Sequence, residues 1–310
     1  MRGRSGAVGV RRRATEAATA NWGCGLARLL APVLLLALAL PSAAFEWEDA
    51  LPPQPGAFAT SAREVFSRAS DNFWGCDLEE QLEFHVTTES GQVMRYLAER
   101  IRKRIRGRTY DLFSIRGGTD RRDYRSLRIQ GRGGSDDLFA WVPDLRRVRR
   151  ITAAQRGDQF FGSNLSLEDL EVHFADRHEI VGRATTLVEG EPAHIVTTHP
   201  LYDSGYDRAD FFIAQSDYAM LEIRFYHVGA LEAYKIAHMP RAETESLNGH
   251  FLPRRMIFQD LETGTQTEIH FRSRLVNPPI DDRMFTKTTL EGHRRLLRSE
   301  PTAPGPIHGE

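Results

Sequence analysis

The chain has 310 residues, of which 41% are hydrophobic, with 41 Lys and Arg against 42 Asp and Glu and a formal net charge of −1 at pH 7. Two cysteines in a chain of this length exclude a disulfide framework and a multi-cysteine zinc cluster. The length is large for one domain but within the range of a single large β-sheet protein.

The first 44 residues have the layout of a secretory signal peptide. Six arginines precede the apolar run 29–40, which ends at Pro41-Ser42-Ala43-Ala44. An apolar run of this length is too short to cross a bilayer core, which needs roughly 20 residues. We therefore predict cleavage after Ala44 rather than retention as a membrane anchor.

Cys24 lies before the apolar run and would leave with the signal peptide, so the mature chain keeps one thiol, Cys76. A lone cysteine is most simply a small, partly buried residue. Export together with a single thiol points to a bacterial periplasm. We expect a periplasmic monomer that is not an integral membrane protein.

A charge asymmetry lies within the near-neutral total. Without residues 1–44 the net charge is −6, whereas Arg95–Arg150 alone carries 17 basic and 7 acidic residues. A basic face on an acidic body can attract anionic lipid headgroups, lipopolysaccharide or an acidic partner. The alternative is that these arginines occupy the solvent side of strands without a specific role.

The rest of the chain is organised as one domain. We expect residues 45–56, which contain several prolines, to be a linker, residues 57–295 to form a single domain, and residues 296–310 to be a disordered tail. Apolar residues at helical spacing predict a helix over Ala57–Ala69, with Thr60 or Ser61 as its cap. Leu165–Phe174 is predicted as a short second helix.

From residue 79 onward the pattern alternates between strands and turns, which is typical of antiparallel β meanders. Residues 82–87, 221–226 and 269–272 alternate between apolar and polar, so each strand is predicted to have one apolar and one wet face. A large sheet with few helices must cover its apolar face, and this geometry suits an apolar groove. The turn signals are Glu89-Ser90-Gly91, Gly117-Gly118, Gly133-Gly134-Ser135-Asp136, Glu189-Gly190-Glu191-Pro192, Asp203-Ser204-Gly205, Asn248-Gly249 and Thr263-Gly264.

The central stretch contains two β-biased runs, Leu138–Val142 and Arg147–Thr152, joined by a Pro-Asp-Leu turn. The sequence G-S-N-L-S-L-E-D-L follows, in which Ser166 can cap a short acidic turn. This order resembles the LolA-like outer-membrane lipoprotein-sorting proteins, whose members carry a tryptophan-bearing strand ending in proline, a basic strand and a "G-S-(D/N)-x-(T/S)-x-E-D-L" segment. The matching residues here are Trp141, Pro143, Arg146 to Ile151, and Gly162 to Leu170.

Two later segments extend the resemblance over about residues 79–291. Tyr206 and Phe211-Phe212-Ile213, followed by 221–226, resemble the family's paired "Y…W-I-D" and "L-R-x-E-Y-Y-D" strands, with Ala214 where the family usually has an acid. Residues 277–290 resemble its closing "N-x-x-I-x-D-x-x-F-T" segment. The Thr119–Gly134 region departs from the family, which usually has a proline-containing passage there.

The resemblance implies a mainly β fold of the LolA/LolB type. Its expected form is a large curved antiparallel sheet, or half-barrel, of about 11 strands with a few covering helices and an interior that holds acyl chains. It also implies no catalysis, no cofactor and no metal. Members of this broader group often appear with RND-type lipid exporters.

No local motif contradicts a non-enzymatic role. The mature sequence has no nucleophile elbow, Walker loop, dinucleotide fingerprint, calcium loop or H-E-x-x-H motif, although a dispersed triad would escape such a search. His173-x-x-Asp176-x-His178 and the pair His194 and His199 come closest to a metal-ligand pattern. Neither spacing matches a standard site, and we interpret these histidines as solvent-facing or loop residues.

Two groups of side chains are the candidate site. Arg147, Arg149 and Arg150 are candidates for binding an anionic headgroup or a partner. The basic run has too few interleaved aromatics for a nucleic-acid platform, so we expect no nucleic-acid partner. In the adjacent phenylalanine pairs one ring should face away from the main core, which favours an exposed apolar patch. The lipid-groove candidates are Phe139, Trp141, Phe160, Phe161, Phe211, Phe212 and Phe225.

Three functional hypotheses follow. The first is a periplasmic carrier that binds acyl chains of lipids or lipoproteins for transfer towards the outer membrane, between an inner-membrane exporter and an outer-membrane acceptor. The second is an accessory module of an RND-type lipid exporter or envelope complex that binds its partner through the basic Arg95–Arg150 face. The third is an envelope hydrolase with a dispersed triad.

Overall fold

The computed structural model describes residues 60–116, 124–131, 136–142, 145–152, 155, 163–292 and 296–297. The predicted signal peptide and linker, Phe160, Phe161 and most of the predicted tail lie outside these ranges. Within the described ranges, no helix combines the length and the apolar character that a membrane crossing requires.

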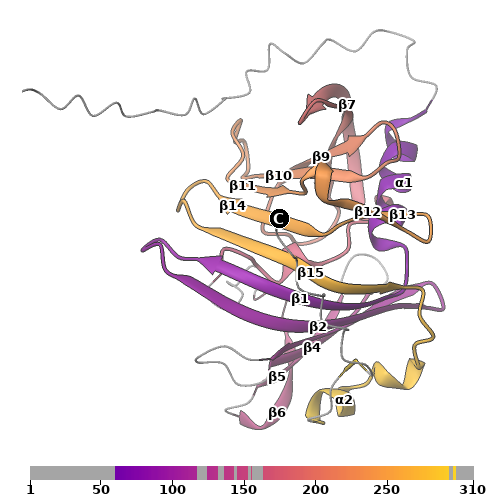
Figure 1. Ribbon diagram of the computed structural model, residues 1–310, viewed down its shortest axis with the longest axis vertical. Coiled ribbons are helices and arrows are strands. Elements are labelled where there is room, and N and C mark those ends of the chain that lie inside the picture. The colour runs from indigo at the N-terminus through magenta and orange to yellow at the C-terminus, as the bar shows by residue number, and fades with distance from the viewer. Residues whose placement is uncertain are drawn as a thin grey trace, which may run out of the picture. The chain divides into compact units, whose positions relative to one another are not determined.

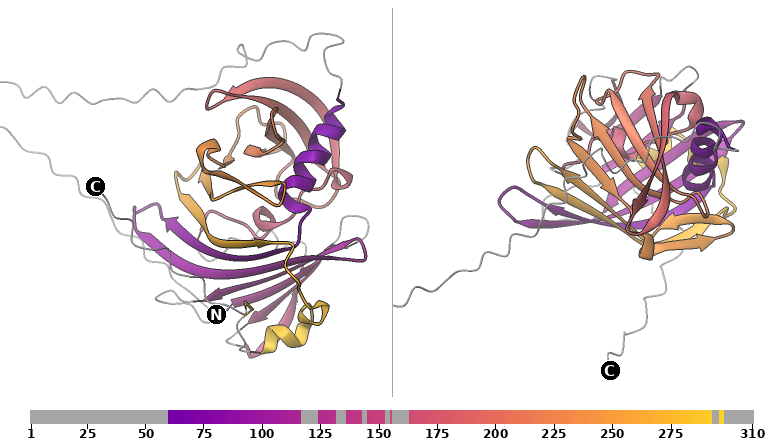
Figure 2. Two further views of the ribbon diagram at one scale, coloured as in Figure 1. Left: turned by 45° about the vertical axis from the view of Figure 1, so that its right-hand side comes forward. Right: turned by 90° about the horizontal axis from the view of Figure 1, so that it is seen from above.

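One antiparallel sheet of 13 strands dominates the described chain, in the order β6-β5-β4-β3-β2-β1-β15-β14-β11-β10-β9-β8-β7 (Figure 1). A separate two-stranded ribbon pairs β12 with β13. The sheet is strongly curved and is not closed, with β6 and β7 as its two outermost strands (Figure 2). The mainly β half-barrel expected from the sequence is confirmed, with 13 strands rather than about 11.

The elements have the following bounds. The helices are α1 (Ala62–Trp74) and α2 (Lys287–Glu291). The strands are β1 (Leu78–Thr87), β2 (Val93–Ile105), β3 (Arg108–Arg116), β4 (Tyr124–Ile129), β5 (Asp137–Val142), β6 (Arg147–Ile151), β7 (His178–Val188), β8 (Glu191–Pro200), β9 (Arg208–Ala214), β10 (Met220–Tyr226), β11 (Lys235–His238), β12 (Thr244–Leu247), β13 (His250–Pro253), β14 (Arg255–Asp260) and β15 (Gln266–Val276).

Strict alternation along β1 defines the two faces of the sheet. Leu78, Glu80, Leu82, Phe84 and Val86 are buried, whereas the residues between them are partly exposed. We call the face that carries these five residues the inner face and the opposite one the outer face. The main hydrophobic core lies on the inner face and includes residues of α1 and of nine strands. Helix α1 itself contacts β7, β8, β9 and β13.

Helix α1 begins later than the sequence predicted. Ser61 is the N-cap, accepting a hydrogen bond from the backbone N–H of Glu64 at 3.1 Å, as expected for one of the two predicted caps. The helix then runs to Trp74 rather than ending at Ala69. Tertiary packing explains the extension, because the burial of Phe73 and Trp74 in the main core stabilises a further helical turn.

The predicted helix over Leu165–Phe174 is wrong. Only a single 3-10 turn forms, over Glu168–Leu170. Its N-cap is Leu167, which makes no side-chain cap bond, rather than the predicted Ser166. Ser166 instead bonds reciprocally with Asp169: the Asp169 N–H donates to Ser166 Oγ at 3.3 Å, and the Ser166 N–H donates to Asp169 Oδ2 at 2.7 Å. The chain then extends beneath the sheet because its side chains bind several different strands, an arrangement that a continuous helix could not satisfy.

A second core lies on the outer face of β2 to β5. Ile101, Leu112, Leu127 and Phe139 pack there against apolar residues of the C-terminal segment, including Leu290 of α2. Helix α2 contacts β4, β5 and β6 from this side (Figure 2). This end of the sheet is therefore covered on both faces.

The packing of α1 gives a test of the fold. Phe66 is fully buried, with its ring centroid 4.6 Å from that of Phe211 on β9. Replacing Phe66 with Ala should lower the free energy of unfolding by about 3–5 kcal/mol, because transfer free energy is lost and a cavity is left. Urea denaturation of the purified protein measures this change.

Val228 provides the control, because its side chain is 85% exposed. Val228→Ala should change the free energy of unfolding by no more than about 0.5 kcal/mol. Equal effects of the two substitutions would contradict the packing of α1 on the inner face.

Candidate functional site

A pocket with an apolar wall lies on the inner face, under α1 and the segment 163–174. Counted with its open mouth, the pocket contains about 640 Å³ of space that no atom fills. The space that water molecules can occupy is about 40 Å³. Its lining comes from α1, from β1, β2, β10, β13, β14 and β15, and from the segment. The lining residues are Phe73, Trp74, Leu78, Glu80, Leu82, Arg100, Arg102, Asp169, Leu170, Glu171, His173, Ile223, Phe225, Leu252, Met256, Phe258, Ile269, Phe271 and Arg274.

One wall of this pocket is apolar. Ile223 and Phe225 come from β10, Met256 and Phe258 from β14, and Ile269 from β15, each at an inward position of its strand. All five are at least nine-tenths buried. Such a wall can remove acyl or other apolar groups from water at about 0.8 kcal/mol per methylene.

The lining also includes charged side chains, and strand pairing places these in a row that continues beyond the pocket. Glu80 on β1 lies opposite Arg274 on β15 and Arg100 on β2. Arg102 on β2 lies opposite Asp111 on β3, which in turn lies opposite Arg128 on β4. We call these six residues the charged row.

Members of the charged row are held by ion pairs. Arg274 Nε lies 2.6 Å from Glu80 Oε1, and Arg100 Nε lies 3.0 Å and 2.9 Å from the two oxygens of Asp111. Arg102 Nε lies 3.4 Å from the same carboxylate. Breaking one partner of such a buried pair typically costs about 3–5 kcal/mol, because the other charge is left uncompensated.

Burial and pairing act in opposite directions on these groups. Burial alone would raise the pKa of Asp111, but Arg100 and Arg102 outweigh it and lower that pKa. Burial, followed by the charge of Arg100, lowers the pKa of Arg102 to about 10. Asp111 and Arg102 therefore remain charged at neutral pH.

Three buried polar atoms of the charged row have no hydrogen-bond partner within the described ranges. One is Nη2 of Arg128, which does not line this pocket. The other two are Nη1 of Arg102 and Oε2 of Glu80, on side chains that are each 2% exposed. A buried donor or acceptor left unsatisfied costs about 1–3 kcal/mol, and more when charged. Both residues line the pocket, so a bound polar group could satisfy them.

The segment 163–174, here called the inner segment, is tied across the inner face. Asn164 Nδ2 donates to the carbonyls of Phe258 and Thr265, each at 3.0 Å. Glu168 accepts from Ser204 Oγ at 2.5 Å and from the N–H of Gly205 at 2.8 Å. These bonds hold the segment against β14 and the loop before β9.

Two charged side chains of the inner segment, Asp169 and Glu171, also line the pocket. Lys235 Nζ on β11 lies 2.8 Å from Asp169 Oδ2, and Arg100 Nη2 donates to the carbonyl of Leu170 at 3.0 Å. Arg128 Nη1 lies 3.7 Å from Glu171 Oε2. Acidic side chains of the inner segment therefore lie beside basic side chains of the sheet.

Two histidines at the end of the inner segment are buried, so the solvent-facing interpretation is wrong for them. His173 is 2% exposed and His178 is fully buried, with ring centroids 5.5 Å apart. His173 lies against Trp74, and His178 lies against Phe66, with centroid separations of 5.2 Å and 5.5 Å. Burial keeps both rings neutral: it lowers the pKa of His173 well below its usual value and, with the charge of Arg177, lowers that of His178 to about 3.

The structure distributes the predicted lipid-groove residues among three places. Phe225 lines the pocket, and Phe211 lies in the main core beside Phe66. Phe139 and Trp141 belong to the second core on the outer face. Phe160 and Phe161 lie outside the described residues.

Phe212 shows why an adjacent aromatic pair need not create an exposed patch. It points away from Phe211, as strand geometry predicts, yet it is only 3% exposed. The guanidinium of Arg224 lies over its ring, 4.6 Å from the centroid. The patch expected for this pair is therefore absent, because a neighbouring arginine covers it.

The arginines of Arg95–Arg150 do not share one solvent face. Arg102 and Arg128 are buried on the inner face, and the side chain of Arg100 beside them is 11% exposed; all three belong to the charged row. Arg147, Arg149 and Arg150 are exposed on β6, and Arg150 lies 2.5 Å from Asp137. The basic composition of this region thus serves two separate places.

The buried charges are the part of the site that sequence reasoning missed. A signal was present on β1, because the period of two that links Leu78 to Leu82 places Glu80 on the same face. Nothing comparable marks its partner Arg274, which lies 194 positions away in the chain.

Comparison with known proteins agrees with this fold. A family model described as "-like: Uncharacterized protein" matches residues 107–292, more than half of the chain. A domain from Vibrio parahaemolyticus, described as an outer membrane lipoprotein-sorting protein domain, aligns with a TM-score of 0.66 and 17% identity, covering 75% of this chain and 100% of that one. The chain therefore belongs to the family that the matching model describes, and its fold is LolA-like.

Two further structures share the LolA-like fold. A DUF1329 family protein from Desulfovibrio piger aligns with a TM-score of 0.66 and 18% identity, covering 74% of this chain and 97% of that one. A LolA superfamily protein from Nitrosomonas europaea aligns with a TM-score of 0.60 and 16% identity, covering 75% of this chain and 100% of that one. Comparison with curated proteins gives no significant match.

The buried histidines make the stability of this LolA-like protein depend on pH. Below about pH 6.5 the unfolded chain binds protons that folded His173 and His178 cannot bind, so each lowers stability as the pH falls. Glu168 acts in the opposite direction, because burial raises its pKa and folding then favours its protonated form. The contribution of one histidine is therefore measured as a difference between variants.

His173→Gln should reduce the loss of stability between pH 7 and pH 5 by about 2 kcal/mol, since one titrating group is removed. Urea denaturation at the two pH values measures this difference. Tyr206→Phe is the control, because the Tyr206 hydroxyl lies 3.4 Å from His173 Nδ1 but its loss removes no imidazole. An unchanged pH dependence in His173→Gln would show that His173 is not held neutral by burial.

Proposed function

We propose that this LolA-like protein is a non-enzymatic periplasmic carrier that binds acyl chains of a lipid or lipoprotein for transfer towards the outer membrane. The observation that carries the proposal is the pocket with an apolar wall and buried charges. The periplasmic location in this proposal rests on the signal peptide predicted over residues 1–44. Carriage by this route needs no chemical step and no cofactor.

The apolar wall can bind acyl chains with considerable strength. Each methylene that leaves water contributes about 0.8 kcal/mol, so four or five of them offset a large part of the cost of association. Aromatic side chains such as Phe225 and Phe258 present broad surfaces to such a chain. Affinity of this kind depends on the apolar area that is buried, so the pocket can bind acyl chains of different length.

The charged row can bind the polar end of the same molecule. Arg102 Nη1 offers a buried donor and Glu80 Oε2 a buried acceptor, each without a partner in the part of the chain described. A headgroup that accepts a hydrogen bond from the guanidinium would relieve the first of these. The pocket is therefore suited to an amphiphile rather than to a purely apolar ligand.

Loading requires the pocket to open. Ligand pockets usually enclose about 300–1,000 Å³, whereas the 40 Å³ open to water here accommodates roughly three water molecules. Leu170, on the inner segment, lines the pocket. Outward movement of the inner segment, with rotation of Met256, would enlarge the pocket without disturbing the strand ladder.

A pocket-filling variant tests carriage. Met256→Trp should weaken lipid binding about tenfold, because the indole displaces roughly two methylenes of the bound chain, or about 1.6 kcal/mol. The readout is native mass spectrometry of the mature protein, purified from the periplasm and incubated with phosphatidylethanolamine–phosphatidylglycerol vesicles. Met256→Leu, which nearly conserves volume, should retain lipid.

Thermal melts confirm that both Met256 variants are folded before lipid is measured. Stoichiometric lipid on the wild type and Met256→Leu, with loss on Met256→Trp, supports the carrier. A wild-type protein that stays free of lipid after incubation would refute it and favour the interaction module described next.

The exposed basic edge supports a second candidate function, an accessory module of an RND-type lipid exporter or envelope complex. β6 is the outermost strand on its side of the described sheet, and it exposes Arg147, Arg149 and Arg150. An outermost strand offers backbone groups for pairing with another chain. Arginines on such an edge favour an acidic partner or an anionic surface.

Charge reversal on β6 separates the two candidates. Arg147→Glu combined with Arg149→Glu should weaken binding to an acidic partner or anionic vesicles more than tenfold, since each basic residue contributes about 1 kcal/mol near an anionic surface. Lipid occupancy of the pocket should stay unchanged. Vesicle co-sedimentation at physiological salt and cross-linking in intact envelopes measure the first effect.

The control for this variant is Arg283→Glu, because Arg283 has a side chain that is 90% exposed and lies outside β6. Loss of binding in both variants would show a general charge effect. Undiminished binding in the β6 variant would remove the basis for the second candidate.

A further inference from the structure

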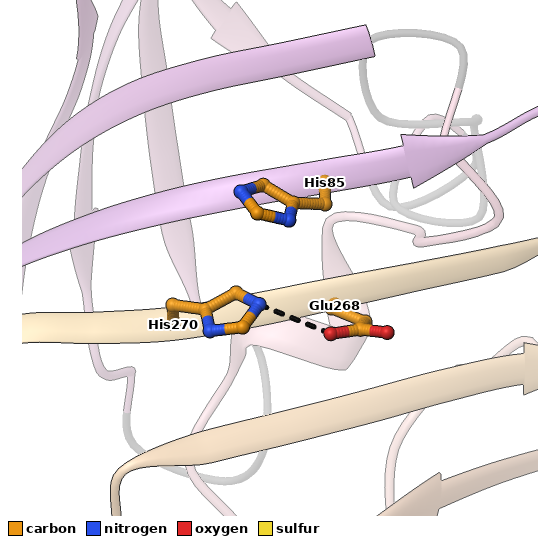
Figure 3. A group of neighbouring side chains, drawn as sticks. All are labelled: His85, Glu268 and His270. Atoms are coloured by element: carbon orange, nitrogen blue, oxygen red, sulfur yellow. Dashed lines mark hydrogen bonds and ion pairs between the residues drawn. The ribbon is translucent and has the colours of Figure 1, made fainter. Parts of the chain in front are cut away.

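Two histidines and a glutamate meet on the outer face of the sheet. His85 comes from β1, and Glu268 and His270 come from β15 (Figure 3). Each offers one ligand atom, and these three atoms lie within 4.8 Å of one another. The side chains are partly exposed, so an ion can reach them from solvent.

Strand register explains why these groups converge. His85 lies directly opposite Glu268 across the antiparallel pair, and His270 lies two positions further along β15, opposite Glu83. Side chains two positions apart share a face of a strand. The intervening residues Phe84 and Ile269 are buried on the inner face, so the three donors point away from the pocket.

The two imidazole rings are already held close together. Their centroids are 4.6 Å apart with 40° between the ring planes. Glu83 Oε1 lies 2.8 Å from His85 Nε2, and Glu268 Oε2 lies 3.0 Å from His270 Nε2. A carboxylate bound to a ligating histidine is a common way to orient the ring toward a metal.

Arginines from neighbouring strands lie around the cluster. Arg95 on β2 lies opposite His85, and Arg255 on β14 lies opposite His270. Arg272 on β15 forms an ion pair with Glu83. A neutral imidazole has the lone pair that a metal needs.

We propose that His85, Glu268 and His270 bind one Zn²⁺ ion on the outer face of the sheet. Two imidazoles and one carboxylate are a donor set that suits this ion and leave a fourth tetrahedral position open to water. Arg255 Nη1 lies 3.5 Å from Glu268 Oε2, so the ion must displace this weak pairing when it binds.

Such an ion would join β1 to β15. These strands come from opposite ends of the described domain, and their pairing connects the N-terminal strands of the sheet to the C-terminal ones. Zn²⁺ bound only by the folded sheet would stabilise this junction by mass action. The site is separate from the inner pocket and does not depend on lipid carriage.

Isothermal titration of the EDTA-treated mature protein with ZnCl₂ at pH 7.5 tests the proposal. The wild type should bind one equivalent, and His270→Ala should bind Zn²⁺ at least about tenfold more weakly, because losing a ligand costs no less than losing an outer-shell partner. His227→Ala is the matched control: His227 lies 3.5 Å from Glu262 in an exposed pair elsewhere, and its loss should change nothing.

A second measurement guards against misfolding of the His270 variant. Glu268→Gln keeps size and shape, and visible absorption of bound Co²⁺ reports whether nitrogen ligands remain. Retained but weaker binding with an altered Co²⁺ spectrum supports the assignment. Equal Zn²⁺ binding by the wild type and a His85→Ala, His270→Ala double variant, or no binding by the wild type, would overturn it and leave the cluster as a cross-strand polar network.

Discussion

The pairing of β1 with β15 is the constraint on which the rest of this structure depends. It joins the group of six strands from β1 through β6 to the later strands, so that all of them form one sheet. On the inner face it places Glu80 opposite Arg274, and on the outer face it places His85 opposite Glu268. A slip of one residue would exchange the two faces, which would bury histidines and expose the apolar wall.

The charged row imposes a cost that a purely structural sheet would avoid. Buried ion pairs often stabilise a protein no more than well-packed apolar residues of similar volume would. Here they lie beside an apolar wall, and among the described residues two of their atoms, in Arg102 and Glu80, have no hydrogen-bond partner. Polar groups of this kind are consistent with a ligand that has both a polar and an apolar part, which is the physical basis of the proposed carrier.

Much of the fold was predictable because local patterns report local geometry. Alternation at Leu82, Phe84 and Val86 indicated both the strand and its buried face, and Ser61 was one of two predicted helix caps. The inner segment was not predictable as a helix or a loop from its own residues. Asn164 and Glu168 bind strands and loops far away in the chain, and these contacts override local preference.

The sequence by itself determined the antiparallel meander, the shared face of Ile223 and Phe225 and the resemblance to the LolA-like family, because these depend on periodicity and short motifs. Only the tertiary structure decided that Phe139 faces the outer core and that the arginines divide between β6 and the charged row. The physical reason is that a period of two marks two faces but not which is inner, and pairing between β1 and β15 depends on contacts distant in sequence.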